Sequence, residues 1–382
     1  MISQMGDSMF IIGMMWLVLD LTGSKTAMGT VAFVSHIPNL VLGLFAGIIV
    51  DTFNRKRIML TADILRAIIV LAIPITFFLD VINLAVIMGC SFLLSLFASA
   101  FNPARDSILP VLVGKTNLLR ANSVIQVSNY IAILLGPIIG AAAITAVGVV
   151  HLFTIDSLTF ILSFAAVLFI KYRPNEKIEK EQINLRKHLK DIIYYVRQEK
   201  KLKILLGITA VNNFFIMGPA IVGLPIFVKD ILNEGAASYA LVEACYGIGM
   251  ILGSILINYV NRFIGKGKIL LIGLIFDGIT FAVLLFINSL PLLMLSIAFH
   301  AIGIPFIVVA RTSLIQEWTD DNRLGRVFSL VNIAVVGMTA LTTGFTGILA
   351  DFVSIDIIFA IFGTGGMLCG FVGYLYKDLR EG

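Results

Sequence analysis

Charge, cysteine and histidine are all scarce in this sequence. Charged residues make up 13% of its 382 positions, whereas apolar residues make up 59% and the mean hydropathy is +1.00. Soluble globular domains carry roughly 25% charged residues, so this composition excludes that class of protein. The three cysteines lie in three separate apolar runs with no histidine at ligand spacing, which argues against a disulfide framework and against a metal site.

Long apolar runs dominate the chain instead. A helix needs about 20 apolar residues to cross the hydrocarbon core of a bilayer. Twelve runs meet this requirement and predict membrane spans at roughly 2–21, 28–50, 58–79, 84–103, 121–146, 149–171, 203–228, 239–261, 268–287, 291–311, 326–349 and 354–376.

Lys and Arg gather in every second gap between these runs and in the C-terminal tail; Lys25 and Lys229 are the exceptions among the gaps. Loops rich in Lys and Arg stay on the cytoplasmic side of a membrane. The pattern therefore predicts a multi-pass protein of the cell membrane with both termini in the cytoplasm. The net charge of +5 comes from these loops, so we expect membrane lipids as the partner of the basic residues, and no nucleic acid.

The longest polar stretch, 172–202, divides the chain into a six-span bundle at 1–171 and a second one at 203–382. Within it, apolar residues at helical spacing face away from basic ones, which predicts an amphipathic helix on the inner membrane surface or a solvated linker helix. The apolar face consists of Leu185, Leu189, Ile192, Ile193 and Val196. Two six-span halves are typical of a transporter whose substrate path runs between them.

The segment after the second run reads Gly47-Ile-Ile-Val-Asp51-Thr-Phe-Asn54-Arg55-Lys56-Arg57. Glycine lets helices approach closely, and an aspartate at a helix end can accept hydrogen bonds from the N-terminus of a neighbouring helix. Asparagine tolerates a left-handed backbone, which we expect at Asn54. The cluster of cations anchors the loop inside the cell.

This segment resembles the cytoplasmic signature of the major facilitator superfamily, with Thr52 in place of the usual Arg and Asn54 in place of the usual Gly. The resemblance implies a conformational latch between the halves in the outward-facing state, formed by Gly47, Asp51, Arg55 and Lys56. A cluster that only orients the chain in the membrane is the alternative. The implied fold is an all-α membrane protein with twelve transmembrane helices in two six-helix bundles, acting as a monomer.

Further motifs are similar to the bacterial branch of the superfamily that contains macrolide efflux and enterobactin export proteins. They are Leu21-Thr22-Gly23-Ser24, Phe101-Asn102-Pro103-Ala104-Arg105, Leu109-Pro110, Ala121-Asn122-Ser123 and Gly325-Arg326-Val327-Phe328-Ser329. Gly136-Pro137-x-x-Gly140 resembles the antiporter motif of the fifth span, although Ala141 stands where a second glycine is frequent. The glycines and the proline predict a close-packed, bendable helix.

Ionisable residues within the spans are few, and such residues usually face a partner or a wet cavity. They are Asp7, His36, Asp63, Arg66, Asp156, Glu243, Asp277 and His300. Asp63 and Arg66 are three residues apart and are expected to pair, with Asp7 as a second partner of Arg66. We interpret Asp156 and Asp277 as structural, and we select Asp7, Glu243 and His300 as candidates for proton coupling.

The seventh span carries the residues best suited to a large amphipathic substrate, namely Asn212, Asn213, Phe214 and Phe215, followed by the helix-flexing Gly218 and Pro219. Asn129 on the fifth span is a secondary candidate. The alternative for the amides is that they hold helices together.

The sequence thus predicts no enzyme but a secondary transporter, most simply one that exports amphipathic drug-like compounds such as macrolides in exchange for protons. Gly114-Lys115-Thr116 lacks the first glycine and the preceding strand of a phosphate loop, so no cofactor is expected and the proton gradient is the energy source. A siderophore or lysophospholipid transporter is the alternative. A transport-silent membrane sensor or assembly partner is the alternative from another class.

Overall fold

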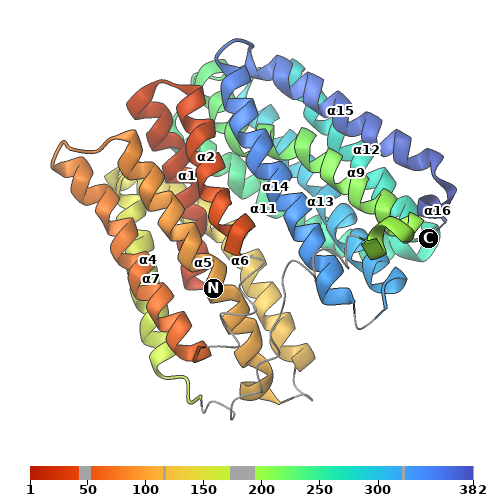
Figure 1. Cartoon of the computed structure of the whole chain (residues 1–382). Helices are drawn as coiled ribbons and strands as arrows, with labels where there is room; N and C mark the ends of the chain where they lie inside the picture. The colour runs from red at the N-terminus through yellow and green to blue at the C-terminus, as the bar shows by residue number, and fades with distance from the viewer. Residues whose placement is uncertain (43–52, 115–117, 173–193, 321–322, 382) are drawn as a thin grey trace. The chain divides into compact units, whose positions relative to one another are not determined.

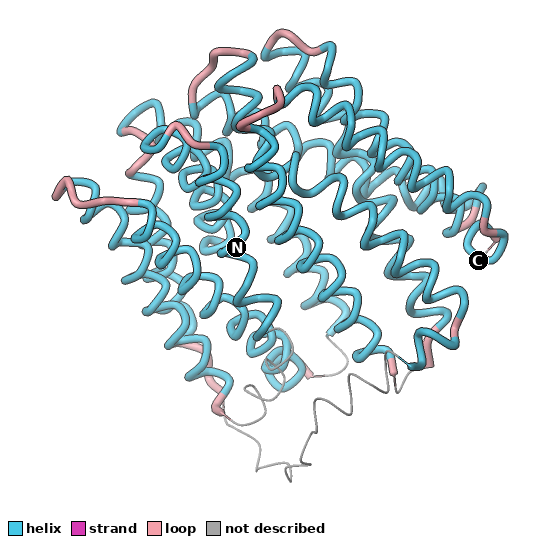
Figure 2. The backbone as a smooth tube through the Cα atoms, turned by 45° about the horizontal axis from the view of Figure 1, so that its top comes forward, coloured by secondary structure: helices cyan, strands magenta, loops and turns pink. Residues whose placement is uncertain are grey.

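The computed structural model describes residues 1–42, 53–114, 118–172, 194–320 and 323–381. In these ranges the chain is helical throughout, without strands, and short loops join the helices (Figure 2). Eleven helices of the described residues are long and apolar enough to cross a membrane. The remaining predicted span, 28–50, begins as α2 (Lys25–Leu42) and continues into residues outside the described ranges. The predicted all-α membrane class is confirmed.

The helices form two compact units, of which the first comprises Met1–Glu179 together with Glu234–Ala244. In this unit α1 packs against α6 and α7, α2 packs against α5, and α4 packs against both α5 and α7. Figure 1 shows α4 and α7 side by side. The bounds are α1 (Ile2–Thr22), α2 (Lys25–Leu42), α4 (Arg55–Phe78), α5 (Leu84–Val113), α6 (Leu118–Val147) and α7 (His151–Leu168).

The second unit comprises Lys180–Asn233 and Cys245–Gly382. Here α12 packs against both α13 and α15, and α9 packs against α14 and α15. The bounds are α9 (Lys200–Gly218), η2 (Pro219–Gly223), α10 (Leu224–Ile226), η3 (Phe227–Ile231), α11 (Ala236–Ile264), α12 (Lys266–Ala282), η4 (Val283–Phe286), α13 (Leu290–Trp318), α14 (Leu324–Ala350), α15 (Ile355–Leu375) and α16 (Lys377–Arg380). The first turns of α11, up to Ala244, group with the first unit.

The two halves repeat one packing scheme. The third span of each half, α4 or α12, packs against the fourth and the sixth, and the first span, α1 or α9, packs against the fifth and the sixth. Such repetition is the structural counterpart of the parallel repeat expected from the sequence. The predicted linker boundaries at 172 and 202 stay predictions. Of the predicted amphipathic face only Val196 lies in the described ranges, where it is buried in the core of the second unit.

Large apolar side chains lie on the outside of the helices as well as in the core. Ile68, Ile255 and Leu295 are at least 60% exposed, whereas Val70, Leu271 and Leu293 on the same or neighbouring helices are completely buried. In water such exposure would mark interaction sites or aggregation hazards. On spans of this length it is the surface that lipid tails cover, since they are as apolar as leucine.

The prediction of a left-handed turn at Asn54 is wrong. Its φ is −65°, and its side-chain oxygen accepts a hydrogen bond from the backbone N–H of Arg57 at 3.2 Å, so that it caps the N-terminus of α4. Asparagine is favoured both in left-handed turns and as an N-cap, because its short side chain can bond to nearby backbone in either place. The residue alone does not distinguish the two roles; the helix that begins at Arg55 decides between them.

Candidate functional site

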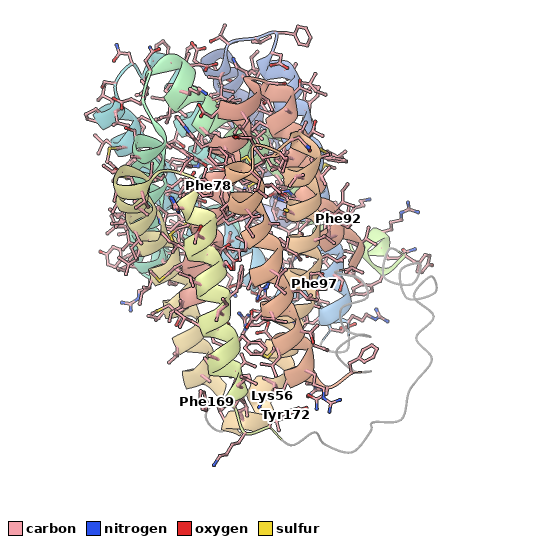
Figure 3. The ribbon with its side chains drawn as sticks, turned by 90° about the vertical axis from the view of Figure 1, so that its left-hand side faces the viewer. Lys56, Phe78, Phe92, Phe97, Phe169 and Tyr172 are labelled. Atoms are coloured by element: carbon pink, nitrogen blue, oxygen red, sulfur yellow. The ribbon has the colours of Figure 1, made fainter. Side chains whose placement is uncertain are left out.

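Two of the four predicted latch residues lie in the described ranges, and both bind carbonyl groups of the first unit. Arg55 Nη1 donates to the carbonyl oxygen of Ser107 on α5 at 2.9 Å. Lys56 Nζ donates to the carbonyl oxygens of Leu168 at 2.9 Å and of Ile170 at 2.8 Å, beyond the last helical hydrogen bonds of α7 (Figure 3). A cation is favourable at this end of a helix because its last carbonyls are unpaired and carry partial negative charge.

Gly47 and Asp51, the other two latch residues, lie outside the described residues. The latch between the halves therefore stays a prediction. What Arg55 and Lys56 do in the structure is to join α4 to α5 and α7 at one end of the first unit.

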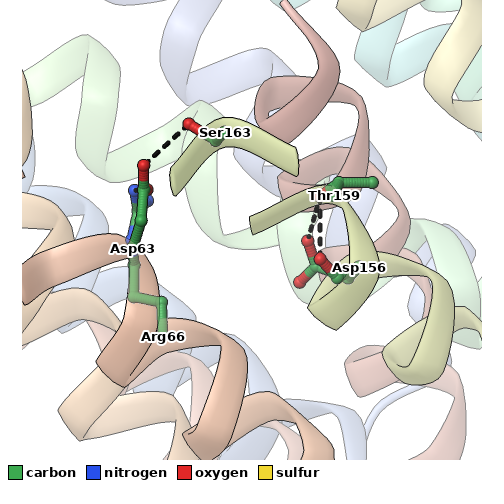
Figure 4. A network of polar contacts seen from close by, with 5 residues as sticks. All are labelled: Asp63, Arg66, Asp156, Thr159 and Ser163. Atoms are coloured by element: carbon green, nitrogen blue, oxygen red, sulfur yellow. Dashed lines mark hydrogen bonds and ion pairs between the residues drawn. The ribbon is translucent and has the colours of Figure 1, made fainter. Parts of the chain in front are cut away.

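Asp63 and Arg66 form a buried ion pair on α4, as their spacing predicts. Arg66 Nη2 donates to Asp63 Oδ1 at 2.5 Å, and Ser163 Oγ of α7 donates to the other carboxylate oxygen at 2.7 Å (Figure 4). The guanidinium also lies over the rings of Phe101 and Phe160, with its central carbon 4.7 and 4.3 Å from their centroids. A buried carboxylate satisfied at both oxygens by a fixed cation and a hydroxyl is an anchor that joins α4 to α7.

A second buried carboxyl group in this unit, Asp156 of α7, lies against the first turns of α1. Thr159 Oγ1 lies 3.2 Å from Asp156 Oδ1, whereas Asp156 Oδ2 has no hydrogen-bond partner among the residues that the structure describes (Figure 4). A Cβ atom built on Gly6 would lie only 2.1 Å from Asp156 Oδ1, so α1 and α7 approach closely at this point. Asp7, the half-buried proton-coupling candidate next to Gly6, is within electrostatic range of Asp63 and Arg66.

The predicted glycine–proline motif of α6 faces α1. A Cβ atom on Gly136 would lie 2.9 Å from Ser8 Cβ, and one on Gly140 would lie 3.4 Å from Met9 Cγ. Pro137 lies inside the continuous helix. The glycines thus allow two helices to pack closely, whereas helix flexing at this motif stays a prediction. On the same pair of helices, Asn129 Oδ1 accepts a hydrogen bond from Gln4 Nε2.

Glu243 lies near the start of α11 and accepts a hydrogen bond from the hydroxyl of Tyr239, one turn earlier. The Tyr239 ring is buried and stacks on Trp16 of α1, with ring centroids 6.5 Å apart and an interplanar angle of 21°. The Glu243 carboxyl group is half-buried, and its hydrogen-bond donor is a tyrosine hydroxyl. Its role in proton coupling stays a prediction.

In the second unit, the structure brings together residues that the sequence analysis treats separately. His300 on α13, Asp277 and Thr280 on α12 and Asn212 on α9 form one network. His300 Nε2 lies 3.4 Å from Asp277 Oδ1, and Asn212 Nδ2 donates to Asp277 Oδ2 at 3.4 Å. Asp277 and His300 are 1% and 2% exposed. A signal for the pair is present in the sequence, because both residues fall near the middle of consecutive spans.

The imidazole of His300 is held on its other side as well. Its Nδ1 atom is 2.8 Å from Thr280 Oγ1, and its ring stacks on Phe281 at a centroid distance of 4.2 Å. The histidine is therefore fixed by a hydroxyl, a carboxyl and an aromatic face. Asn212 is one of the predicted substrate contacts, and its side chain is directed at Asp277, the arrangement expected of an amide that holds helices together.

The other predicted substrate residues of α9 contact an aromatic cluster. Phe214 stacks on Phe362 of α15, with ring centroids 6.1 Å apart, and contacts Phe345 of α14 at 6.0 Å. Phe215 meets Phe362 edge-on at 5.8 Å. Asn213 Nδ2 donates to the carbonyl oxygen of Thr209 one turn earlier, so its amide oxygen is not used in that bond. The four rings form an apolar surface with an amide beside it.

Immediately after this cluster α9 changes its geometry. Gly218 lies against α14, where a Cβ atom would be 2.3 Å from Thr346 Oγ1 and 2.5 Å from the carbonyl oxygen of Thr342. From Pro219 the helix continues as a π-helix to Gly223 and, after a short α-helical turn, again from Phe227 to Ile231. Proline lacks the N–H that an α-helix needs, and π-helical segments often occur at functional sites.

Comparison with known proteins places this architecture in a family. The profile of the transmembrane secretion effector family matches residues 1–381. The multidrug efflux pump Tap of Mycolicibacterium fortuitum is 25% identical to the chain over 385 residues, which cover 98% of this chain and 93% of Tap. Macrolide efflux protein A of Streptococcus pyogenes is 21% identical over 383 residues, covering 100% of this chain and 94% of that protein.

Solved structures show the same fold at low sequence identity. The nucleoside transporter NupG superposes with a TM-score of 0.81 at 12% identity and covers 98% of both chains. A bacterial homologue of the iron transporter ferroportin, in an inward-facing state, superposes with a TM-score of 0.78 at 16% identity and covers 98% of this chain and 95% of that one. With eleven candidate spans in the described residues, two similarly packed halves and a family match over residues 1–381, the chain belongs to the transmembrane secretion effector family of the major facilitator superfamily and is a membrane transporter.

Proposed function

We propose that this transporter exports amphipathic, drug-like compounds such as macrolides across the cell membrane, in exchange for protons, by alternating access of its two halves. The observation that carries the proposal of export is the full-length similarity to two relatives named as efflux proteins, Tap and macrolide efflux protein A. Similarity over the whole chain matters here because a transporter needs both halves to move its substrate.

The chemistry of α9 supports an amphipathic organic substrate. Phe214 and Phe215, with the rings that they contact, offer a broad apolar and aromatic surface, and Asn213 offers an amide beside it. Binding sites for drug-sized molecules are typically apolar with a few polar groups that fix orientation. Asn212 and Asn129 already bond to other side chains, so Asn213, Phe214 and Phe215 are the stronger candidates for substrate contact.

Proton coupling is supported by ionisable groups within the spans. An ionised side chain in a bilayer is costly unless it has a partner or access to water, so an ionisable group that persists there is suited to bind and release a proton. Asp7 in the first unit, Glu243 on α11 and His300 in the second unit are the proposed proton sites. The proton gradient then supplies the energy, and no cofactor takes part.

The proposed setting is the cell membrane, with both termini in the cytoplasm, lipids around the helices and one chain as the working unit. The charge sorting of the loops supports the orientation, since basic loops stay inside. The latch residues Gly47, Asp51, Arg55 and Lys56 then lie at the cytoplasmic face, where they would stabilise the outward-facing state.

The test is drug accumulation in a bacterium that lacks its own macrolide pumps. Cells that express the chain should accumulate several-fold less radiolabelled erythromycin than cells with the empty vector, and a protonophore should abolish the difference. Equal accumulation in both strains would contradict the export of macrolides and favour the alternatives, a siderophore or lysophospholipid carrier or a transport-silent sensor. A difference that survives the protonophore would contradict coupling to protons and leave export intact.

A further inference from the structure

The contacts of Thr280 are compatible with two protonation states of the buried Asp277–His300 pair. Thr280 Oγ1 lies 2.8 Å from the carbonyl oxygen of Phe276 and 2.8 Å from His300 Nδ1. A hydroxyl has a single hydrogen, so it donates either to the helix carbonyl or to the histidine, and not to both. Two proton arrangements are therefore compatible with the same positions of the heavy atoms.

In the first arrangement Thr280 donates to the carbonyl oxygen of Phe276, and His300 Nδ1–H donates to Thr280. On the opposite side of the ring, Nε2 faces Asp277 Oδ1 at 3.4 Å. These two atoms are within ion-pair distance but are not hydrogen-bonded among the described residues, and a further proton on either of them would remove the repulsion between their facing lone pairs. The Asp277–His300 pair then holds two protons and is neutral overall, either as a carboxylic acid with an imidazole or as a carboxylate with an imidazolium.

In the second arrangement the Thr280 hydroxyl rotates and donates to His300 Nδ1. The ring then carries one proton, on Nε2, which points at the Asp277 carboxylate. The pair holds one proton fewer and has a charge of −1. Passing between the two arrangements releases or takes up one proton at His300 Nδ1 and rotates the Thr280 hydroxyl, while the heavy atoms keep their positions.

The Asp277 site of the second unit differs from the equivalent Asp63 site of the first unit in the basic residue that faces the carboxyl group. Asp63 on α4 and Asp277 on α12 lie on equivalent helices of the two halves, but Asp63 is paired with Arg66, which stays charged at every physiological pH. In the described part of the chain His300 is the one basic side chain within ion-pair distance of Asp277, and histidine exchanges protons near neutral pH in water. The first unit thus has a permanent ion pair where the second has a titratable one.

We propose that Asp277 and His300 together hold the proton that drives transport, and that Asn212 transmits their charge to α9. This inference rests on the proposed proton-coupled export, and it assigns the coupling proton to a pair in which Asp277 is interpreted as structural from the sequence alone. Asn212 Nδ2 donates to Asp277 Oδ2, and the amide oxygen of Asn212 is buried without a hydrogen-bond partner in the described part of the chain. Loss of the proton leaves the pair with a net charge of −1 that no cation of the described chain offsets, which strengthens the hydrogen bond from Asn212 to the Asp277 carboxylate and pulls α9 toward α12.

The surroundings of the pair agree with this role. The ring of Tyr246 on α11 is 6.4 Å from that of His300, and Cys369 on α15 donates to the carbonyl oxygen of Ile208, one turn before Asn212. These two titratable groups lie beside the network on neighbouring helices, and neither is a lysine or an arginine. α9 carries Phe214 and Phe215 directly after Asn212, so a shift of this helix reaches the proposed substrate surface.

The test uses the full chain in liposomes, with radiolabelled erythromycin as the probe. Two readouts are compared: uptake driven by an imposed pH gradient, and exchange of erythromycin across the membrane without a gradient. We expect Asp277→Asn and His300→Gln to lose uptake driven by the gradient at least tenfold and to retain exchange, because the carrier still moves but no longer carries the proton. Asp156→Asn is the matched control, since it neutralises an equally buried carboxyl in the first unit, and it should retain both readouts.

Each result decides between the proposals. If the wild type takes up erythromycin without any dependence on the pH gradient, proton-coupled export fails, and this inference with it. If the wild type depends on the gradient and both Asp277→Asn and His300→Gln still do, only the assignment to this pair is overturned. Loss of gradient-driven uptake in Asp156→Asn alone would move the proton site to the first unit and overturn it too. Should Asp277→Asn fail to fold, His300→Gln decides on the same two readouts.

Discussion

At the scale of single residues, the polar side chains within the spans differ in how far away their partners lie along the chain. Asp63 pairs with Arg66 one helical turn away, so the periodicity of the helix is enough to predict the pair. Asp277 contacts Asn212, which lies 65 residues earlier in the chain, and His300 on the next span. Their contact depends on how the helices are rotated about their axes, which spacing in the sequence does not specify. The sequence alone therefore does not show which side chains surround Asp277, and its structural interpretation stays a prediction.

Gly6 is the residue at which a small change is expected to have a large effect. Gly6→Ala would place a Cβ atom 2.1 Å from Asp156 Oδ1 and 2.2 Å from Thr159 Oγ1, so that α1 and α7 would have to separate. Overpacking of this kind costs about 1–3 kcal/mol. We expect the free energy of unfolding in mixed detergent micelles to fall by that amount.

The matched control is Gly207→Ala on α9, where a Cβ atom would meet nothing within 4 Å. There alanine should leave the stability unchanged or raise it by roughly 0.5–1 kcal/mol, as in any exposed helix. Equal effects of the two substitutions would mean that α1 does not approach α7 as closely as the structure shows.

At the scale of elements, the seventh span is the least regular helix of the described chain. Pro219 and Pro225 are visible in the sequence and predict a helix that can flex, but they do not predict which geometry replaces the α-helix. The structure has π-helical turns at Pro219–Gly223 and Phe227–Ile231. It also shows that Gly218 packs directly on the buried threonines of α14, a contact that the sequence does not predict.

This contact leads to a prediction of second-site rescue. Gly218→Ala should destabilise the protein by about 1–3 kcal/mol, because its Cβ atom would lie 2.3 Å from Thr346 Oγ1. Thr346→Ala alone should cost little stability, since within the described ranges the Thr346 hydroxyl is buried without a hydrogen-bond partner. In the double variant the alanine at 346 makes room for the one at 218, so the two effects should not add when unfolding is measured in detergent.

Rescue is expected to be partial, because the Cβ atom at position 218 would also lie 2.5 Å from the carbonyl oxygen of Thr342. Strict additivity would contradict the contact.

At the scale of the whole molecule, the class, the number of spans and the family follow from the sequence, because a bilayer requires long apolar runs and sorts the charges of the loops. The pairing of helices within each half does not follow from those runs, since lipid-facing and core-facing residues are equally apolar. Ile68 and Val70 illustrate this: both are β-branched and apolar, yet one is 60% exposed and the other completely buried. The repeat of α4 with α5 and α7 by α12 with α13 and α15 becomes evident only in the structure.

The orientation of the molecule leads to a last prediction, which labelling of single cysteines can test. α4 has 24 residues and so is about 36 Å long at 1.5 Å per residue, more than the hydrocarbon thickness of about 30 Å. Its two ends therefore reach opposite faces of the membrane. Phe53 before it and Val81 after it are 63% and 56% exposed, so a cysteine at either position should be reachable. The basic residues Arg55–Arg57 predict that the first end lies inside. In a background without Cys90, Cys245 and Cys369, a membrane-impermeant maleimide should label Val81→Cys on intact cells and Phe53→Cys only after permeabilisation. The reverse labelling pattern would place both termini outside and reverse the proposed direction of transport. Labelling of both cysteine variants on intact cells would mean that α4 does not span the membrane.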